Sequence, residues 1–225
     1  MESKILIPKI LDFLTSLEKN NNRDWFEKNK KQYLEVKNGF DEFVNLLIQA
    51  AKSLDPEIGY LEPKNCTFRI YRDVRFSKDK SPFKTNFGAY ISRGGKNSDW
   101  AGYYLHIEPN GSFVAGGKYM PQGPALKAIR ETIFYEPEVF RSILNKPSFK
   151  KRFPEIMGER LKTAPQGYPK DHPDLDLIQY KSYAVSQPLS NETLSSPDLL
   201  AEISYGWKEI KVLNDFLNKA MEHVI

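Results

Sequence analysis

The sequence contains very little of the chemistry that builds disulfides or metal clusters. One of its 225 residues is cysteine, Cys66, and three are histidine. A single thiol excludes an internal disulfide and a zinc cluster made of cysteines. The chain has no run of about 18 apolar residues, so we expect no membrane-spanning helix. Its opening stretch, MESKILIPKILDFL, lacks the basic start and the small-residue cleavage site of a signal peptide, and we expect a cytoplasmic protein.

A large excess of one charge is also missing. Lysine and arginine number 33 against 29 aspartates and glutamates, which gives a net charge of +4. Nucleic-acid-binding proteins usually concentrate more positive charge than this. The apolar fraction of 40%, with 13% aromatics, is sufficient for a core. We expect one domain that spans residues 1–225, since no repeat or linker is visible.

Helical periodicity dominates the two ends of the chain. Apolar residues recur at helical spacing over residues 7–19, and again over residues 22–54, where Asp55-Pro56 ends the pattern. We expect Gly39 to interrupt the second of these helices. The later helices are predicted over residues 124–135, 137–145 and 196–224, with an irregular segment over residues 146–172.

The middle third changes to the alternation that is typical of strands. Asn110-Gly111 is a strong hairpin signal, because both residues tolerate positive φ. The pattern predicts an α+β fold in which a central antiparallel or mixed sheet, built as a meander, has N-terminal and C-terminal helices packed around it. The expected strands are residues 68–73, 87–93, 103–108, 112–117 and 181–186.

Basic residues are concentrated in one short stretch, residues 64–86, with aromatic and turn-forming residues between them. Only two acids, Asp73 and Asp79, accompany the basic residues. We expect any function to lie here, because guanidinium groups match phosphate and carboxylate oxygens and lysines add point charges. The basic residues are Lys64, Arg69, Arg72, Arg75, Lys78, Lys80 and Lys84.

Strand alternation predicts a polar face next to this stretch. Arg69 and Asp73 should lie opposite the apolar side of residues 68–73, and Tyr104, His106 and Glu108 should share one face of the hairpin. A two-residue turn would set His106 opposite Ala115 and Tyr104 opposite Gly117, and such small partners leave space above a sheet. We therefore predict a concave basic pocket on the sheet.

The candidate roles follow from the residue types. His106 and Asp73 form the candidate acid/base pair, because imidazole exchanges a proton near neutral pH. The backbone N–H groups of Gly116 and Gly117 offer further donors to an anion. Structural alternatives stay open: an ordinary sheet histidine, an ion-pair network and a bulge. The candidate ligand-binding residues are Arg69, Arg72, Arg75, Lys80, Lys84, Tyr104, Gly116 and Gly117.

A second polar stretch, residues 165–183, contains His172 close to Asp174 and Asp176. These side chains have the chemistry of metal ligands. The residue order instead favours a short helix that Asp171 caps and Pro173 opens. We therefore predict no metal site, and no cofactor is indicated.

Three kinds of function fit these patterns. The first is binding of a small anionic ligand, such as a phosphorylated compound, in the basic pocket, with acid/base chemistry as an option. The second, less favoured, is a nucleic-acid-binding accessory protein in which Tyr71, Phe76 and Phe83 stack on bases. The third is an interaction module whose charges only stabilise its sheet. No membrane partner is expected.

The stretch FRIYRDVRFSKDKSPFKTNFGAYI resembles a family of uncharacterised bacterial and fungal proteins, catalogued as domain of unknown function twenty-four sixty-one. The resemblance extends to NNRDWF, GYYLHIEPNGSFVAGGKYMP and GYPKDHPDLDLIQYKSYAVSQPL, and so covers essentially the whole chain. The resemblance implies a single domain, and it does not indicate an activity. The chain departs from the family pattern at Phe83, where Tyr is usual, and at Asn86, where His is frequent. The matching positions are Trp25, Arg69, Arg72, Asp73, Arg75, Phe76, Asp79, Lys80, Pro82, Lys84, His106, Gly116, Gly117 and His172.

Overall fold

The computed structural model describes residues 7–225, so the first six residues of the opening stretch lie outside it. The chain begins with α1 (Ile7–Lys19), α2 (Arg23–Lys28) and α3 (Lys30–Leu54). The side chain of Asn22 caps α2 by accepting a hydrogen bond from the N–H of Trp25.

The predicted break at Gly39 is wrong, and the long helix is interrupted at Asn29 instead. The side-chain amide of Asn29 donates to the carbonyl of Trp25 at 2.8 Å. This local bond competes with regular helical hydrogen bonding and separates α2 from α3. Gly39 lies inside α3, which continues to Leu54.

The sheet confirms the predicted α+β class and the meander. Its four strands run in the order β1-β2-β3-β4 and every neighbouring pair is antiparallel. Two short helices, η1 (Pro56–Ile58) and α4 (Pro63–Cys66), precede it. The strands are β1 (Phe87–Ile91), β2 (Gly102–Ile107), β3 (Phe113–Lys118) and β4 (Tyr183–Pro188).

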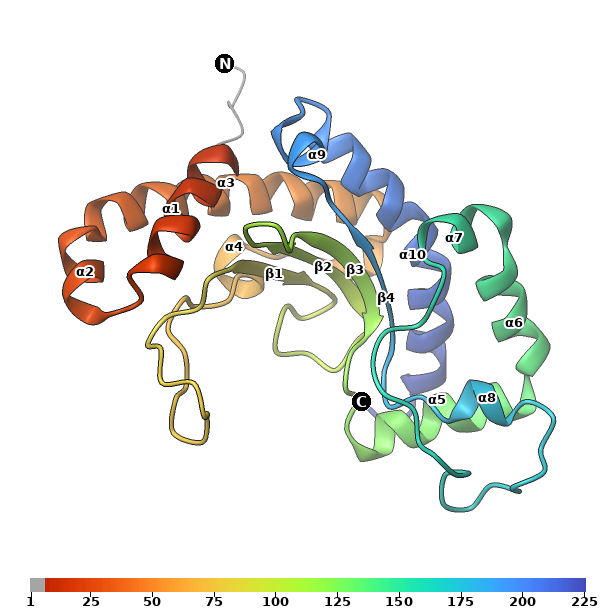
Figure 1. Cartoon of the computed structure of the whole chain (residues 1–225). Helices are drawn as coiled ribbons and strands as arrows, with labels where there is room; N and C mark the ends of the chain where they lie inside the picture. Colours follow the sequence, from red (N-terminus) through yellow and green to blue (C-terminus); the bar gives the residue numbers. More distant parts are fainter. Residues whose placement is uncertain (1–6) are drawn as a thin grey trace.

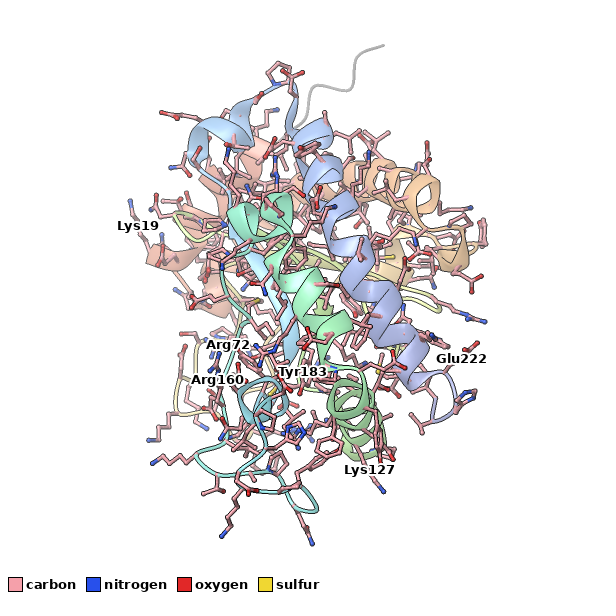
Figure 2. All side chains as sticks on the ribbon, turned by 90° about the vertical axis from the view of Figure 1, so that its right-hand side faces the viewer. Lys19, Arg72, Lys127, Arg160, Tyr183 and Glu222 are labelled. Carbon is pink, nitrogen blue, oxygen red and sulfur yellow. The ribbon has the colours of Figure 1, made fainter. Side chains whose placement is uncertain are left out.

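A helical excursion separates β3 from β4. It contains α5 (Gly123–Tyr135), α6 (Pro137–Asn145), α7 (Pro147–Arg152) and α8 (Leu175–Ile178), so part of the segment predicted to be irregular is helical. Pro147 occupies the first turn of α7, where a missing N–H costs nothing. The chain ends with α9 (Asn191–Ser195) and α10 (Leu199–Met221). Figure 2 shows α6 and α7 beside α10, in front of β4.

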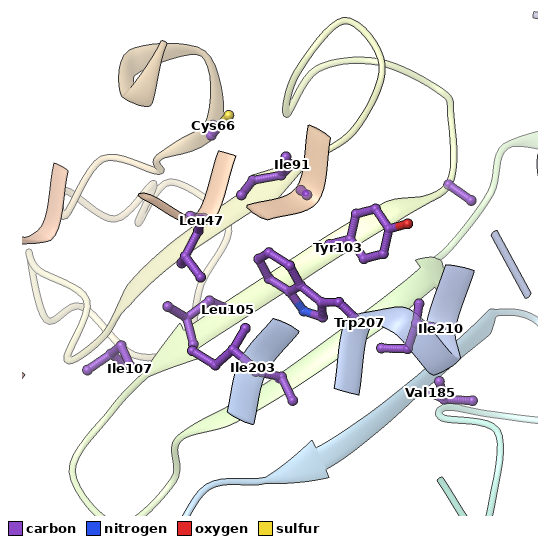
Figure 3. Packing of buried hydrophobic residues seen from close by; sticks show 14 of the residues in the cluster. Leu47, Cys66, Ile91, Tyr103, Leu105, Ile107, Val185, Ile203, Trp207 and Ile210 are labelled. Carbon is purple, nitrogen blue, oxygen red and sulfur yellow. The ribbon is translucent and has the colours of Figure 1, made fainter. Parts of the chain in front are cut away.

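Helices cover one face of the sheet. In Figure 1, α1, α3 and α10 lie on one side of the curved strands, and loops project from the other side. The ring of Tyr103 packs against Trp207 of α10, with centroids 5.2 Å apart (Figure 3). Both side chains are fully buried. Alternation then places Tyr104 and His106 on the face that the helices leave open.

The predicted strand over residues 68–73 is wrong. Within this segment only Tyr71 makes an isolated bridge, with Phe83, and Thr67 just before it makes another, with Ala89. The N–H of Arg72 donates to the carbonyl of Pro82 at 3.0 Å, but Pro82 has no N–H to return, and the pairing goes no further. Residues 67–86, which we call the basic arm, project from the sheet beside β1 (Figure 1).

The hairpin register also differs from the prediction. His106 lies opposite Phe113, and Tyr104 lies opposite Ala115. The turn is centred on Pro109 and Asn110, one residue earlier than predicted, and the N–H of Gly111 closes it by donating to the carbonyl of Glu108 at 3.1 Å. The Ser112 hydroxyl also accepts from the N–H of Glu108 and donates to its carbonyl, at 2.9 and 2.8 Å. The shift of two residues preserves the faces but replaces a small partner of His106 with an aromatic ring.

One continuous cluster of buried side chains extends from Ile7 in α1 to Met221 in α10. It contains side chains of the sheet, of the N-terminal helices and of the C-terminal helix. No helix within residues 7–225 combines the length and the apolar character that crossing a bilayer requires.

Candidate functional site

The basic arm is fastened to the N-terminal helices at one point. The side-chain amide of Asn21 donates to the carbonyl of Phe83 at 2.9 Å and accepts from its N–H at 3.1 Å. The ring of Phe26 stacks on Phe83, with centroids 4.0 Å apart and planes at 14°. Phe83 is 3% exposed. The NNRDWF stretch therefore supports the basic arm, and Phe83 is not available to stack on a base.

The tip of the arm neutralises much of its own charge. Arg72 pairs with Asp79, and Arg75 pairs with Asp73 at 2.6 Å. Hydrogen bonds from Ser81, then from Arg72, lower the pKa of Asp79 to about 2. These pairs are largely exposed, so each contributes little stability. They set the shape of the tip.

A neighbouring part of the arm carries three positive charges, of which, in the part of the chain that the structure describes, only that of Arg72 is paired with an acid, Asp79. The pKa of Lys84 is lowered, first by burial and then by the nearby charges of Arg69 and Arg72. The ammonium of Lys84 lies 5.6 Å from the centroid of the Phe68 ring. Within residues 7–225, Arg69 forms no hydrogen bond or ion pair with its side chain. We call Arg69, Arg72 and Lys84 the cation cluster.

A row of polar side chains runs along the open face of β2. The Tyr104 hydroxyl lies 2.9 Å from Nδ1 of His106, and Nε2 of His106 lies 3.2 Å from Oε2 of Glu108. The Thr85 hydroxyl donates to the other oxygen of Glu108 at 3.0 Å. This network assigns the imidazole proton to Nε2, with Tyr104 as the donor to Nδ1.

Burial sets the protonation states in this row. It lowers the pKa of His106, although Glu108 opposes the change. Burial, followed by the charge of Glu108, raises the pKa of Tyr104 to about 12. His106 is therefore a neutral imidazole near neutral pH, and its ring is stacked on Phe113 at 4.7 Å between centroids. A neutral imidazole held by a carboxylate can accept and return a proton.

The cation cluster and the polar row are neighbours. The ring of Phe68, which carries Lys84 on its face, makes an edge contact with Tyr104 at 6.3 Å. Thr85, the residue after Lys84, is bound to Glu108. We call the combined surface the open-face site: Arg69, Arg72, Lys84, Tyr104, His106 and Glu108.

Other predicted site residues lie outside this surface arrangement. Asp73 accepts hydrogen bonds from the guanidinium of Arg75, so it is not the partner of His106. The carboxylate next to His106 is that of Glu108. Strand alternation already placed Glu108 on the same face as His106. It did not indicate that Glu108, and not Asp73, would be the carboxylate beside the imidazole. The ammonium of Lys80 donates to the carbonyl of Val74 at 3.0 Å.

The two glycines of β3 have structural reasons to be glycine. A Cβ on Gly116 would lie 2.3 Å from Cγ2 of Ile210, so this residue lets α10 approach the sheet. Gly117 has a φ of +107°, and a Cβ there would lie 2.2 Å from the carbonyl of Tyr183. Gly116 thus belongs to the helix-covered face.

The polar stretch around His172 is occupied by its own contacts. Arg141 binds Asp174 at 2.7 Å and Asp176 at 3.1 Å, and His172 lies against Phe134. The helix begins at Leu175 after Asp174, and not at Pro173 as predicted. Residues 7–225 contain no group of three or more His, Cys, Asp and Glu side chains placed to hold a metal ion.

Two cavities lie away from the open-face site. One, of about 120 Å³, is enclosed between the end of α3, the loop after β1 and α10. The other, of about 490 Å³, is an open depression beside Asp41 and Tyr60. Neither is lined by a residue of the predicted basic pocket. The open-face site is a surface formed by the sheet and the basic arm.

These features define a class of protein: an α+β protein whose antiparallel meander is covered by helices on one face and carries a polar row beside a basic arm on the other. The chain belongs to the family described as "Conserved hypothetical protein (DUF2461)", whose family model matches residues 9–216. The resemblance seen in the sequence is thereby confirmed. No curated protein and no solved structure matches the chain.

Proposed function

We propose that the protein binds a small anionic ligand, such as a phosphorylated compound, on the open-face site. The observation that carries this proposal is the cation cluster. Arg69, Arg72 and Lys84 lie close enough to disturb one another, since the charges of both arginines lower the pKa of Lys84. An anion between them would remove this repulsion and would accept hydrogen bonds from all three side chains.

The roles within the cluster differ. Arg69 makes no side-chain hydrogen bond within residues 7–225 and is exposed, so both edges of its guanidinium are available to the ligand. Arg72 is shared with Asp79, which fixes its direction. Lys84 is partly buried, and its ammonium lies over the ring of Phe68 and supplies a positive charge to the cluster. Two planar donors and one point charge suit a phosphate group.

Acid/base chemistry on the ligand is the second part of the proposal. The row from Tyr104 through His106 to Glu108 lies beside the cation cluster and links three groups that exchange protons. The Tyr104 hydroxyl would pass its proton to Nδ1 of His106 and take up a proton from the ligand, and Glu108 would orient the ring and stabilise the imidazolium. Glu108 takes the place that the sequence suggested for Asp73, because Asp73 is bound to Arg75. The cytoplasm is the proposed location, which fits a chain whose cysteine is a free, buried thiol.

The test is a calorimetric titration of the protein with pyrophosphate, nucleotides and sugar phosphates. We expect Arg69→Ala and Lys84→Met to weaken binding at least tenfold while the melting temperature stays close to that of the wild type. Lys78→Ala is the matched control, because Lys78 is exposed at the tip of the arm, outside the cluster. Equal losses in all three variants, or no binding by the wild type, would contradict the proposal.

Nucleic-acid binding is a second candidate, favoured by one observation. Phe76, at the tip of the arm, is 95% exposed, and the Arg75 guanidinium lies 6.0 Å from its ring centroid. An exposed ring among cations is suited to stacking on an unpaired base. In that case affinity for a short single strand would fall steeply with salt, and Phe76→Ala and Lys78→Ala would both reduce it.

A further inference from the structure

A buried polar gap lies between α3, β2 and α10, on the opposite side of the sheet from the open-face site. Tyr103 is fully buried, and its hydroxyl has no hydrogen-bond partner among residues 7–225. The same is true of both polar atoms of the Asn214 side chain, which is also fully buried. Figure 3 shows the Tyr103 hydroxyl pointing away from the Trp207 ring. Buried polar atoms without partners are costly and rare.

This gap lies where the buried face of α10 changes from apolar to polar residues. Trp207, Ile210 and Asn214 follow one another at helical spacing and are all fully buried. The first two pack on the sheet, but Asn214 puts an amide at a position that packing alone would fill with an apolar side chain. One turn later, Asn218 accepts from the N–H of Ala101 at 2.8 Å and fastens the loop before β2 to the helix.

Asp55 completes the gap. This carboxyl follows the last turn of α3 and is 7% exposed. Burial raises its pKa, which Lys211 partly offsets. Burial also raises the pKa of Tyr103, and the charge of Asp55 raises it further, while Asn214 acts in the opposite direction. Asp55 and Asn214 therefore both lie near the Tyr103 hydroxyl, but neither meets the geometry of a hydrogen bond to it.

The space beside these groups is a real cavity. Its volume of about 120 Å³ is lined by Asp55 and Tyr103, among others. At about 30 Å³ for each water molecule, it has room for about four waters or for one small organic molecule. The mouth is formed by exposed side chains, with the Arg93 guanidinium 4.7 Å from the ring centroid of Trp100.

The charges around the cavity favour a cation. Glu57 is paired with Arg93 at 3.1 Å, and Asp215 is paired with Lys211 at 2.6 Å. Asp55 is left as the carboxylate without an ion-pair partner among the described residues. A primary ammonium has three N–H donors, and the cavity lining offers the Asp55 carboxylate and the Tyr103 hydroxyl as acceptors. The buried amide of Asn214 is a neighbour of that hydroxyl but is not part of the lining.

We propose that this cavity is a second ligand site, which binds a small primary amine in its ammonium form between Asp55 and Tyr103, with the buried amide of Asn214 next to the Tyr103 hydroxyl. The proposal is independent of the open-face site, because no residue is shared. The ammonium would satisfy the orphan Tyr103 hydroxyl and offset the buried charge of Asp55. The substituent on nitrogen must be small and directed toward Trp100, since the volume admits only a few further heavy atoms.

The test uses methylammonium chloride as the probe, in an amine-free cacodylate buffer, with the thermal midpoint and calorimetric heat as readouts. We expect a dose-dependent rise in the midpoint of the wild type. Asp55→Asn should abolish it, and Tyr103→Phe should weaken binding about tenfold. Asp171→Asn, an exposed carboxylate that does not line the cavity, is the matched control and should keep the response. Tetramethylammonium, which has no N–H, should produce no shift.

Two further outcomes decide against the proposal. An equal shift with potassium chloride or tetramethylammonium would mean a general cation or salt effect. A crystal structure grown with methylammonium that shows only ordered waters bridging Asp55, Tyr103 and Asn214 would make the cavity a water-filled part of the core. If Asp55→Asn fails to fold, the Tyr103→Phe titration and the crystal structure still decide the question.

Discussion

The side-chain amide of Asn21 binds both backbone polar groups of Phe83, a residue 62 positions further along the chain. An amide presents one donor and one acceptor side by side, so it imitates a neighbouring strand for a single residue. The basic arm carries the cation cluster, and this contact fixes the position of the arm. The turn between α1 and α2, which contains Asn21, therefore controls the geometry of the open-face site.

We predict that Asn21→Ala loosens the basic arm. Two hydrogen bonds disappear and the partly buried backbone of Phe83 loses its partners, so the free energy of unfolding should fall by about 1–3 kcal/mol. Amide hydrogen exchange should also become faster over residues 70–84. Asn20→Ala is the control, because Asn20 binds only the carbonyl of Ser16 in its own helix. Unchanged exchange in the arm of Asn21→Ala would show that the aromatic stack alone holds it.

The protonation of His106 should make stability depend on pH. Its pKa in the folded protein is lowered by burial, below the ordinary value of the unfolded chain. The neutral ring therefore stabilises the fold above about pH 6.5, and this contribution is lost as the pH falls toward the lowered pKa. Chemical unfolding of wild type and His106→Gln at several pH values should show a weaker dependence in the variant. His223→Gln is the control, since His223 is exposed near the C-terminus. Identical profiles for wild type and His106→Gln would contradict the prediction.

Gly116 provides a test of packing against anion binding. In Gly116→Ala the new methyl group meets Ile210 and the carbonyl of Gly102, so we expect a loss of about 1–3 kcal/mol. Gly123→Ala is the matched control, because a Cβ there meets nothing within 4 Å. If Gly116→Ala were as stable as the control but lost pyrophosphate binding, the glycine would be a ligand-binding residue after all.

Sequence periodicity was sufficient for the class of fold and for the elements that carry it. The helix over residues 7–19, the end of the long helix before Asp55-Pro56 and four of the five predicted strands are present. These features depend on local patterns of apolar residues. The errors occur where single residues redirect the backbone: Asn29 in the helix, Pro82 beside residues 68–73, and Pro109 and Asn110 at the centre of the hairpin turn.

The candidate site was only partly accessible from the sequence. Alternation placed Tyr104, His106 and Glu108 together, and the density of cations located the basic arm. The sequence could not show that Asp73 turns to Arg75, or that Phe113 covers His106. The position of Phe113 depends on the register of the hairpin, and that of the basic arm depends on the contact between Asn21 and Phe83, which joins segments far apart in the chain.

The most direct test of the account measures the ionisation of Lys84 itself. Lysine amines carrying ¹³C-methyl groups can be titrated by NMR, and Lys84→Met assigns the signal. We predict that the pKa of Lys84 is below that of an ordinary lysine and rises when pyrophosphate is added, because a nearby anion stabilises the charged form. In Arg69→Ala the starting pKa should be higher and the rise smaller. A pKa of Lys84 that does not respond to pyrophosphate, or a rise no larger than that of Lys78, would contradict anion binding at the cation cluster.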